Sequence, residues 1–108
     1  MAELDPEDGK IVTLARSVRA RTGAAEGAAV RDTDGRTYAA GTVELSALRL
    51  TALQAAVAAA VSSGAEGLEA GAVVTEAAEL DAESVAAVKE LGGSAKLLLA
   101  DVSGTVRD

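Results

Sequence analysis

The chain has 108 residues and a formal net charge of −7, and it contains no Cys, no His and one aromatic residue, Tyr38. The acidity disfavours binding to nucleic acid or anionic membranes, and the missing Cys and His exclude disulfides, thiol nucleophiles and the commonest general base. No apolar segment has the length of a membrane span, and the acidic start lacks a signal-peptide pattern, so we expect a cytoplasmic protein. The bias toward Ala, Val, Gly and Arg suggests a bacterial source.

The first predicted element is a helix that begins after Asp5. Asp5 is a favourable N-cap residue, Pro6 suits the first helical position, and Gly23 is a typical helix stop. Apolar segments then follow one another without a linker or a repeat. We therefore expect one domain over residues 1–108, with residues 103–108 as a flexible tail.

A β-hairpin is predicted next. Residues Gly27–Asp32 and Arg36–Val43 both have strand character. Asp34 and Gly35 lie between them and form a common hairpin turn pair.

The second half of the chain alternates helices and strands. A helix is predicted over Ser46–Ser63, a buried strand over Leu68–Thr75, a helix from Asp81 to Leu91, and a second strand over Ala95–Val102. A strand–helix–strand unit needs a right-handed crossover, so the last two strands should be parallel neighbours in a mixed sheet. The order helix, hairpin, helix, strand, helix, strand predicts the α/β class.

Several local motifs occur in an order that points to one family. Glu26–Val30 followed by Asp34 and Gly35 matches its first strand and turn, and Thr42–Glu44 matches two residues of an Asn-Val-Glu element. Ala56, Val57, Ala60, Val61 and Gly64 keep the spacing of its central helix. From about residue 8 to residue 100 the chain resembles the small homotetrameric cytidine deaminases. The resemblance implies a three-layer α/β/α sandwich with a mixed sheet of about four to five strands.

The resemblance also assigns positions in a former deaminase site. Thr51 stands where the family has a zinc-binding Cys, and Leu53 stands where it has the catalytic Glu. Asp81 and Ser84 stand at the second pair of zinc ligands. Thr42 and Glu44 correspond to the ribose-binding element and are possible ligand-binding residues.

These departures remove the family's chemistry. Zinc lowers the pKa of a bound water and Glu moves protons to the base, but hydroxyl groups make a poor zinc cage and Leu53 is aprotic. The position of the family's first stacking Phe is Ala24. We therefore expect no metal, no cofactor and no enzymatic activity, that is, a pseudoenzyme.

Three functions remain as hypotheses. The first is a noncatalytic structural or protein-interaction domain that forms a homo-oligomer, a dimer or tetramer, with room for an unidentified protein partner. Family members assemble through their central helices, and the small-residue face formed by Ala52, Ala55, Ala56 and Ala59 suits either such packing or packing on the chain's own sheet. The second is a module that binds a nucleoside, nucleotide or small metabolite. The third is a divalent-cation-dependent enzyme that uses the acidic cluster of residues 76–83.

Overall fold

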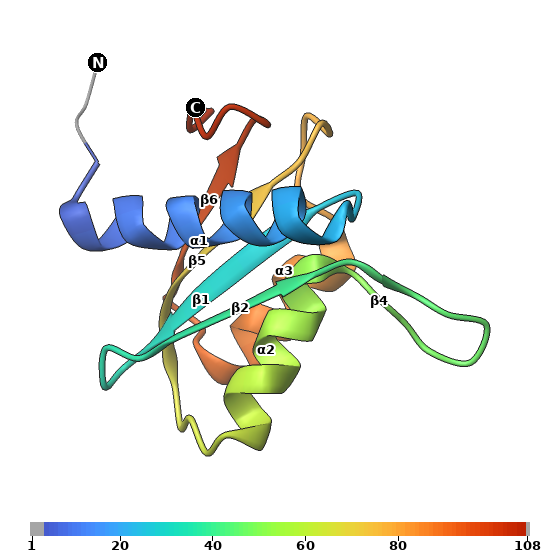
Figure 1. The fold of residues 1–108 in the computed structure, drawn as a ribbon. Helices are drawn as coiled ribbons and strands as arrows, with labels where there is room; N and C mark the ends of the chain where they lie inside the picture. The colour runs from blue at the N-terminus through green and yellow to red at the C-terminus, as the bar shows by residue number, and fades with distance from the viewer. Residues whose placement is uncertain (1–3, 108) are drawn as a thin grey trace.

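The computed structural model describes residues 4–107, which form three helices, a four-stranded sheet and a separate two-stranded hairpin (Figure 1). The helices are α1 (Pro6–Thr22), α2 (Ala52–Ser62) and α3 (Ala82–Leu91). The strands are β1 (Gly27–Asp32), β2 (Thr37–Gly41), β3 (Val43–Glu44), β4 (Arg49–Leu50), β5 (Leu68–Val74) and β6 (Lys96–Ala100).

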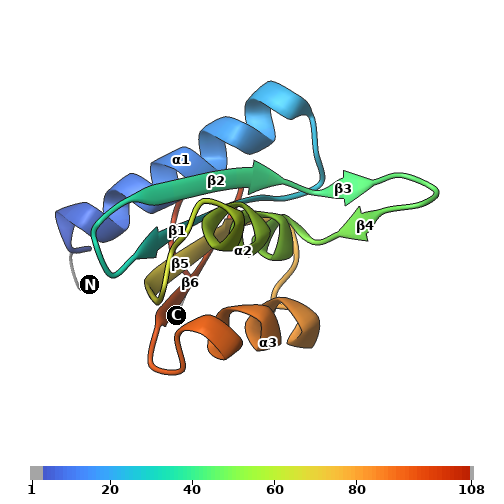
Figure 2. The same ribbon diagram turned by 90° about the horizontal axis from the view of Figure 1, so that it is seen from below.

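The main sheet is mixed and is covered by helices on both faces. Its strand order is β2-β1-β5-β6, with β5 and β6 parallel and the other neighbours antiparallel. Helix α1 covers one face, and helices α2 and α3 cover the other, as the view from below shows (Figure 2). The predicted α/β class, three layers and parallel final strand pair are confirmed.

Small side chains bring these layers close together. One core cluster, which includes Val30, Leu53 and Val73, lies between the sheet and helices α2 and α3, and a second lies under α1. Gly27 shows how close the layers are, because a Cβ atom at this position would overlap the carbonyl oxygen of Ala15 in α1. Helix α1 therefore rests directly on the backbone of β1, which a larger residue at position 27 would prevent.

The ends of α1 and the turn of the hairpin follow the sequence prediction. The Asp5 carboxylate accepts a hydrogen bond of 2.8 Å from the backbone N–H of Glu7, and Gly23 closes the helix with φ +70°. Gly35 in the hairpin turn has φ +88°, a value that glycine adopts without strain. Strand β2 ends at Gly41, two residues before the predicted limit.

The predicted start of the second helix at Ser46 is wrong. Val43 and Glu44 pair with Leu50 and Arg49 in an antiparallel hairpin, β3–β4, and the helix begins only at Ala52. Thr51 and Gln54 form a capping box: the Thr51 Oγ1 accepts from the Gln54 N–H, and Gln54 Oε1 accepts from the Thr51 N–H. This pair fixes the helix start more strongly than the apolar spacing before it.

The last described residues form a hydrogen-bonded turn after β6. In residues 101–107 the Asp101 carboxylate accepts from the backbone N–H groups of Ser103 and Thr105, and the Arg107 N–H donates to the Leu99 carbonyl at 2.7 Å. Flexibility of 103–108 stays a prediction, and Asp108 lies outside the described residues. Between residues 4 and 107, none of the helices has the length and apolarity that a membrane crossing requires.

Candidate functional site

A cleft opens at the end of the sheet where β5 finishes and β1 begins. Its cavity volume is about 460 Å³. Its walls come from the residues before β1, the β3–β4 hairpin, the start of α2, the segment after β5 and the start of α3. Clefts beyond the carboxyl ends of strands are the usual ligand sites of open α/β sheets, which makes this cleft the candidate site.

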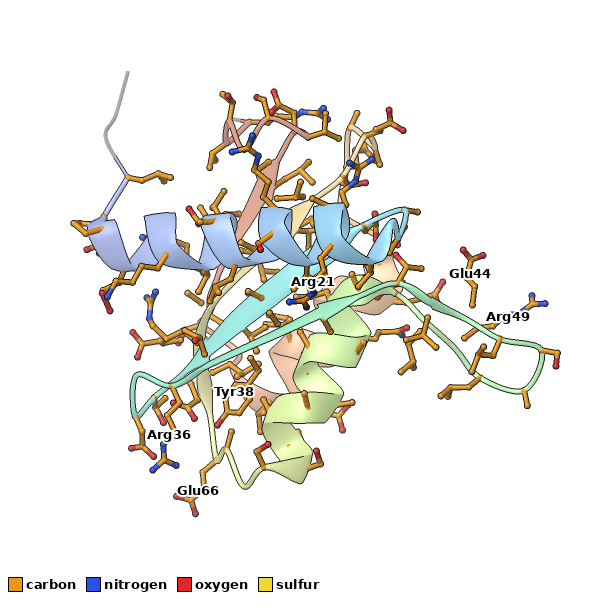
Figure 3. The ribbon with its side chains drawn as sticks, viewed as in Figure 1. Arg21, Arg36, Tyr38, Glu44, Arg49 and Glu66 are labelled. Atoms are coloured by element: carbon orange, nitrogen blue, oxygen red, sulfur yellow. The ribbon has the colours of Figure 1, made fainter. Side chains whose placement is uncertain are left out.

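The charged side chains that line the cleft are mostly acidic. They are Glu26, Glu44, Glu76, Asp81, Glu83 and Arg49, five carboxylates against one guanidinium. Glu44 and Arg49 lie on the β3–β4 hairpin, at the opposite side of the molecule from Tyr38, Arg36 and Glu66 (Figure 3). Such a cleft repels phosphate groups and favours uncharged or cationic ligands.

Two of the residues assigned to the former deaminase site meet here. Thr51 is the N-cap of α2, and Ser84 lies in the first turn of α3. The Ser84 hydroxyl donates a hydrogen bond of 2.7 Å to the Thr51 Oγ1 across 33 positions of sequence. The N-termini of two helices are thus joined directly through side chains.

The other two assigned positions lie apart from this contact. Asp81 is the N-cap residue of α3 and lines the cleft, but its side chain makes no capping hydrogen bond. Leu53 is completely buried in the core cluster under α2 and is absent from the cleft wall. The position that the resemblance assigns to a proton-transferring Glu therefore carries an apolar side chain that packs into the core.

The two possible ligand-binding residues both line the cleft, and they differ in availability. The Thr42 hydroxyl is already used, since it accepts a hydrogen bond of 3.0 Å from the Glu26 N–H. Glu44 is exposed, and within residues 4–107 its carboxylate has no hydrogen bond or ion pair. Glu44 is therefore the stronger candidate for contact with a ligand.

This fold defines a class: a small α/β protein with one helix on one sheet face, two on the other, and a cleft between two helix N-termini. A family model described as cytidine deaminase-like matches residues 4–104. The chain belongs to this cytidine deaminase-like family, as its motif order predicted. A search of curated proteins finds no match.

Solved structures give the same result for the fold. Cytidine deaminase from Burkholderia pseudomallei has a TM-score of 0.77 and 23% identity, covering 91% of this chain and 87% of that one. Cytidine deaminase from Mycobacterium tuberculosis has a TM-score of 0.72 and 27% identity, covering 97% and 90%. That from Mycobacterium leprae has a TM-score of 0.73 and 19% identity, covering 97% and 93%.

The comparisons overturn the prediction that the chain is not an enzyme. The matching family is named for an enzymatic activity, and the solved proteins that share the fold are cytidine deaminases. The prediction extended the loss of the zinc ligands and of the catalytic Glu from deamination to enzymatic activity in general. A shared fold can carry different chemistry, so that step was not justified by the residues.

The zinc that the family resemblance implies can still be tested against the residues present. Thr51 and Ser84 offer neutral hydroxyl groups, whereas zinc sites use thiolate, imidazole or carboxylate ligands. Two ligand atoms on a tetrahedral zinc lie roughly 3.3–3.8 Å apart, given usual zinc–ligand bond lengths. The Thr51 and Ser84 oxygens are only 2.7 Å apart and already hydrogen-bonded to each other. These two hydroxyl groups do not fit zinc, and across residues 4–107 the Asp81 carboxylate is not part of a group of three or more His, Cys, Asp or Glu residues that could hold an ion.

The acidic segment of residues 76–83 is the other candidate metal site at the cleft. Glu76, Asp81 and Glu83 line the cleft, but across residues 4–107 no group of three or more His, Cys, Asp or Glu residues is close enough to hold an ion. The carboxylates are spread around the opening. The geometry therefore gives the cation-dependent hypothesis no support.

Sequence reasoning missed three residues that shape the site. Arg49, the only cation of the cleft, was placed inside a helix, and Gln54 was not recognised as the partner of Thr51. The Thr-x-x-Gln spacing was a readable signal for that capping box. Glu26 comes to the cleft from a loop, and no local pattern indicates this.

Proposed function

We propose that this chain binds an unphosphorylated nucleoside in the acidic cleft. The observation that carries the proposal is the exposed Glu44 carboxylate on the wall of a cavity of about 460 Å³. A carboxylate accepts hydrogen bonds from the hydroxyl groups of a ribose, and the volume falls within the usual range for small-molecule sites. Sequence reasoning ranked this function second.

The charge of the cleft narrows the ligand class. Five acidic side chains and one arginine line the opening, so a nucleotide would bring its phosphate into a negative potential. A nucleoside has no such charge. The cytidine deaminases with this fold support a pyrimidine nucleoside as the first ligand to test.

Thermal stability in the presence of ligands tests this proposal. We expect cytidine or uridine to raise the Tm and cytidine monophosphate to raise it less, because binding to the folded state stabilises it. Glu44→Gln should weaken the shift. The matched control is Glu66→Gln, an exposed Glu far from the cleft, which should leave it unchanged (Figure 3). No shift with any nucleoside would contradict the proposal.

The same protein should be assayed for conversion of cytidine to uridine. Turnover would add an activity to the binding function, and a ligand shift without turnover would limit the function to binding. The sequence predicts one domain over residues 1–108 in a cytoplasmic protein. We propose the same, so the assay uses the full chain at a pH and salt concentration typical of the cytoplasm.

A second candidate is an oligomeric interaction domain, which sequence reasoning ranked first. Leu45 and Leu48 at the tip of the β3–β4 hairpin are 60% and 49% exposed. The hairpin projects from the body of the molecule (Figures 1 and 2). Exposed large apolar side chains on a projecting element are typical of protein contacts.

The small-residue face of α2 is partly packed on the chain's own sheet and partly free for contact with another subunit. Ala52 and Ala56 are fully buried in the chain's own core, whereas Ala55 and Ala59 are partly exposed. Val61 in the last turn of this helix is 53% exposed and continues its apolar surface. These side chains support association of α2 with another subunit.

Mass measurement in solution tests the second candidate. We expect a dimer or tetramer, and we expect Leu45→Ser with Leu48→Ser to shift it toward the monomer. Val102→Ser is the matched control, since Val102 is also exposed, at 42%, but lies on the C-terminal turn. A monomeric unmodified protein would contradict this candidate.

A further inference from the structure

We propose that the hydrogen bond between Ser84 and Thr51 replaces a metal ion as the link between the N-termini of α2 and α3, so that the fold needs no zinc. The link is a single bond of 2.7 Å between two hydroxyl oxygens. This inference is independent of what the cleft binds. It concerns what holds the two helices together where the family resemblance implies a shared metal.

The Thr51 oxygen is organised from two sides. It accepts from the Gln54 N–H at 3.1 Å and from the Ser84 hydroxyl at 2.7 Å. A hydroxyl oxygen has two lone pairs, and both are used by these donors. The helix cap and the inter-helix link therefore depend on one atom.

The link is shielded from water on the Ser84 side. The Ser84 residue is only 3% exposed, and Val88, one turn later in α3, is fully buried in the core. A buried hydroxyl without a partner is costly, so the Ser84 side chain requires an acceptor at this place. Thr51 supplies it, and the register of α3 against α2 becomes fixed.

Helices α2 and α3 have few other polar ties. Across residues 4–107 no other side-chain hydrogen bond or ion pair joins the two helices, and Val57 of α2 and Leu91 of α3 belong to the same apolar cluster. Apolar contacts alone allow one helix to slide along another more readily than a directed hydrogen bond does. The hydroxyl pair thus fixes the orientation of α3 relative to α2, as a metal ion with a ligand from each helix would.

The first experiment uses the unmodified full chain with metal added or removed. We expect no bound zinc by elemental analysis, and we expect the Tm to stay within about 1 °C in zinc chloride or in EDTA, because the hydroxyl pair takes no metal. One zinc per chain, or a lower Tm in EDTA, would overturn the proposal.

The second experiment is a double-mutant cycle. We expect Ser84→Ala to lower the Tm by about 4–8 °C, the usual effect of one lost hydrogen bond in a domain near this size. Thr51→Val should cost more because it also removes the helix cap. Adding Ser84→Ala to Thr51→Val should cost nothing further, because the Ser84 hydroxyl then has no acceptor.

Additive effects in this cycle would overturn the proposal, because additivity means that the two hydroxyls act separately. The matched control is Ser62→Ala. The Ser62 hydroxyl donates only to the Ala59 carbonyl within its own helix and is exposed. This control should lower the Tm by clearly less than Ser84→Ala does.

A converse variant tests whether the space between the two helix N-termini can hold a metal ion once suitable ligands are present. Thr51→Cys combined with Asp81→Cys and Ser84→Cys places three thiols at the two helix N-termini. We expect this variant to take up one zinc per chain under reducing conditions, and we expect its Tm to become sensitive to EDTA. A folded variant that takes up no zinc would overturn the claim that the hydrogen bond occupies a metal's place.

Discussion

The two ends of the main sheet use carboxylates in opposite ways. At the end near the β1–β2 turn, Asp8 and Asp32 are only 2% and 1% exposed, and their carboxylates accept two and three hydrogen bonds, respectively. At the cleft end, Glu44, Glu76, Asp81 and Glu83 are exposed. A carboxylate whose capacity is used inside the protein stabilises the fold, whereas one that faces solvent is available to a ligand.

Asp8 is the buried carboxylate that pairs with two cationic side chains. Its carboxylate accepts from Arg31 Nη2 at 3.1 Å and from Lys96 Nζ at 2.7 Å, which ties α1 to β1 and β6. Burial alone would raise the pKa of Asp8, but the hydrogen bonds and charges of Lys96 and Arg31 outweigh burial and lower it. The network therefore joins three elements through one charged group.

Removal of the Asp8 charge should give the largest effect. We expect Asp8→Asn to lower the free energy of unfolding by about 3 kcal/mol, because it leaves the largely buried Arg31 guanidinium without its buried counter-charge. Urea denaturation followed by circular dichroism measures this. The control Glu69→Gln removes the exposed partner of Arg31 and should cost at most about 1 kcal/mol. Equal losses would contradict the larger contribution that we assign to the buried Asp8 carboxylate.

Asp32 should give the next effect. Its carboxylate accepts from the backbone N–H groups of Asp34 and Arg36, at 3.0 and 2.9 Å, and from the Tyr38 hydroxyl at 2.9 Å. Asp32→Asn replaces one accepting oxygen by a donor, so the urea midpoint should fall, though less than for Asp8→Asn. Asp34→Asn, on the exposed turn, should leave the midpoint nearly unchanged.

Acid should reveal the same difference between the ends. Burial would raise the pKa of Asp32 too, but hydrogen bonds from Arg36, Tyr38 and Asp34 lower it, as those from Lys96 and Arg31 lower that of Asp8. A carboxyl with a lowered pKa stabilises the fold above its unfolded pKa of about 3.9, and the contribution is lost as the pH falls further.

We therefore expect the urea concentration at the unfolding midpoint to decrease as the pH is lowered below about 4. The fall should be shallower in Asp8→Asn and in Asp32→Asn, each of which lacks one of the titrating groups. A midpoint that stays constant to pH 2 would contradict the assignment of these groups.

Neutralising the cleft carboxylates should give the smallest effect. We expect Glu76→Gln with Glu83→Gln to change the free energy of unfolding by no more than about 0.5 kcal/mol, because exposed charges contribute little. Urea denaturation measures this change too. A large loss of stability would mean that the cleft end also holds the fold together.

Local signals predicted much of the fold. Asp5, Pro6 and Gly23 bound the first helix as expected, and Asp34 and Gly35 form the predicted turn. These features are carried by neighbouring residues, so the sequence alone determines them. The false helix start at Ser46 came from apolar spacing that a stronger local signal, the Thr51–Gln54 cap, overrides.

Long-range pairings were not predictable in the same way. Asp8, Arg31 and Lys96 are widely separated in sequence, and only the sheet register brings them together. The cleft likewise collects side chains from separate loops and helix ends. The resemblance assigned Thr51 and Ser84 to one site, and the structure shows these two side chains in contact. That their positions derive from a deaminase site stays a prediction.

Tyr38 has a practical consequence for the study of this protein. It is the only aromatic residue in the chain, so near-ultraviolet absorbance and intrinsic fluorescence come from one ring. That ring lies at the hairpin end, with its hydroxyl bound to Asp32, and the cleft is at the other end. An optical signal from tyrosine therefore reports unfolding from the hairpin end, and it senses a ligand in the cleft only through the change in stability that the ligand causes.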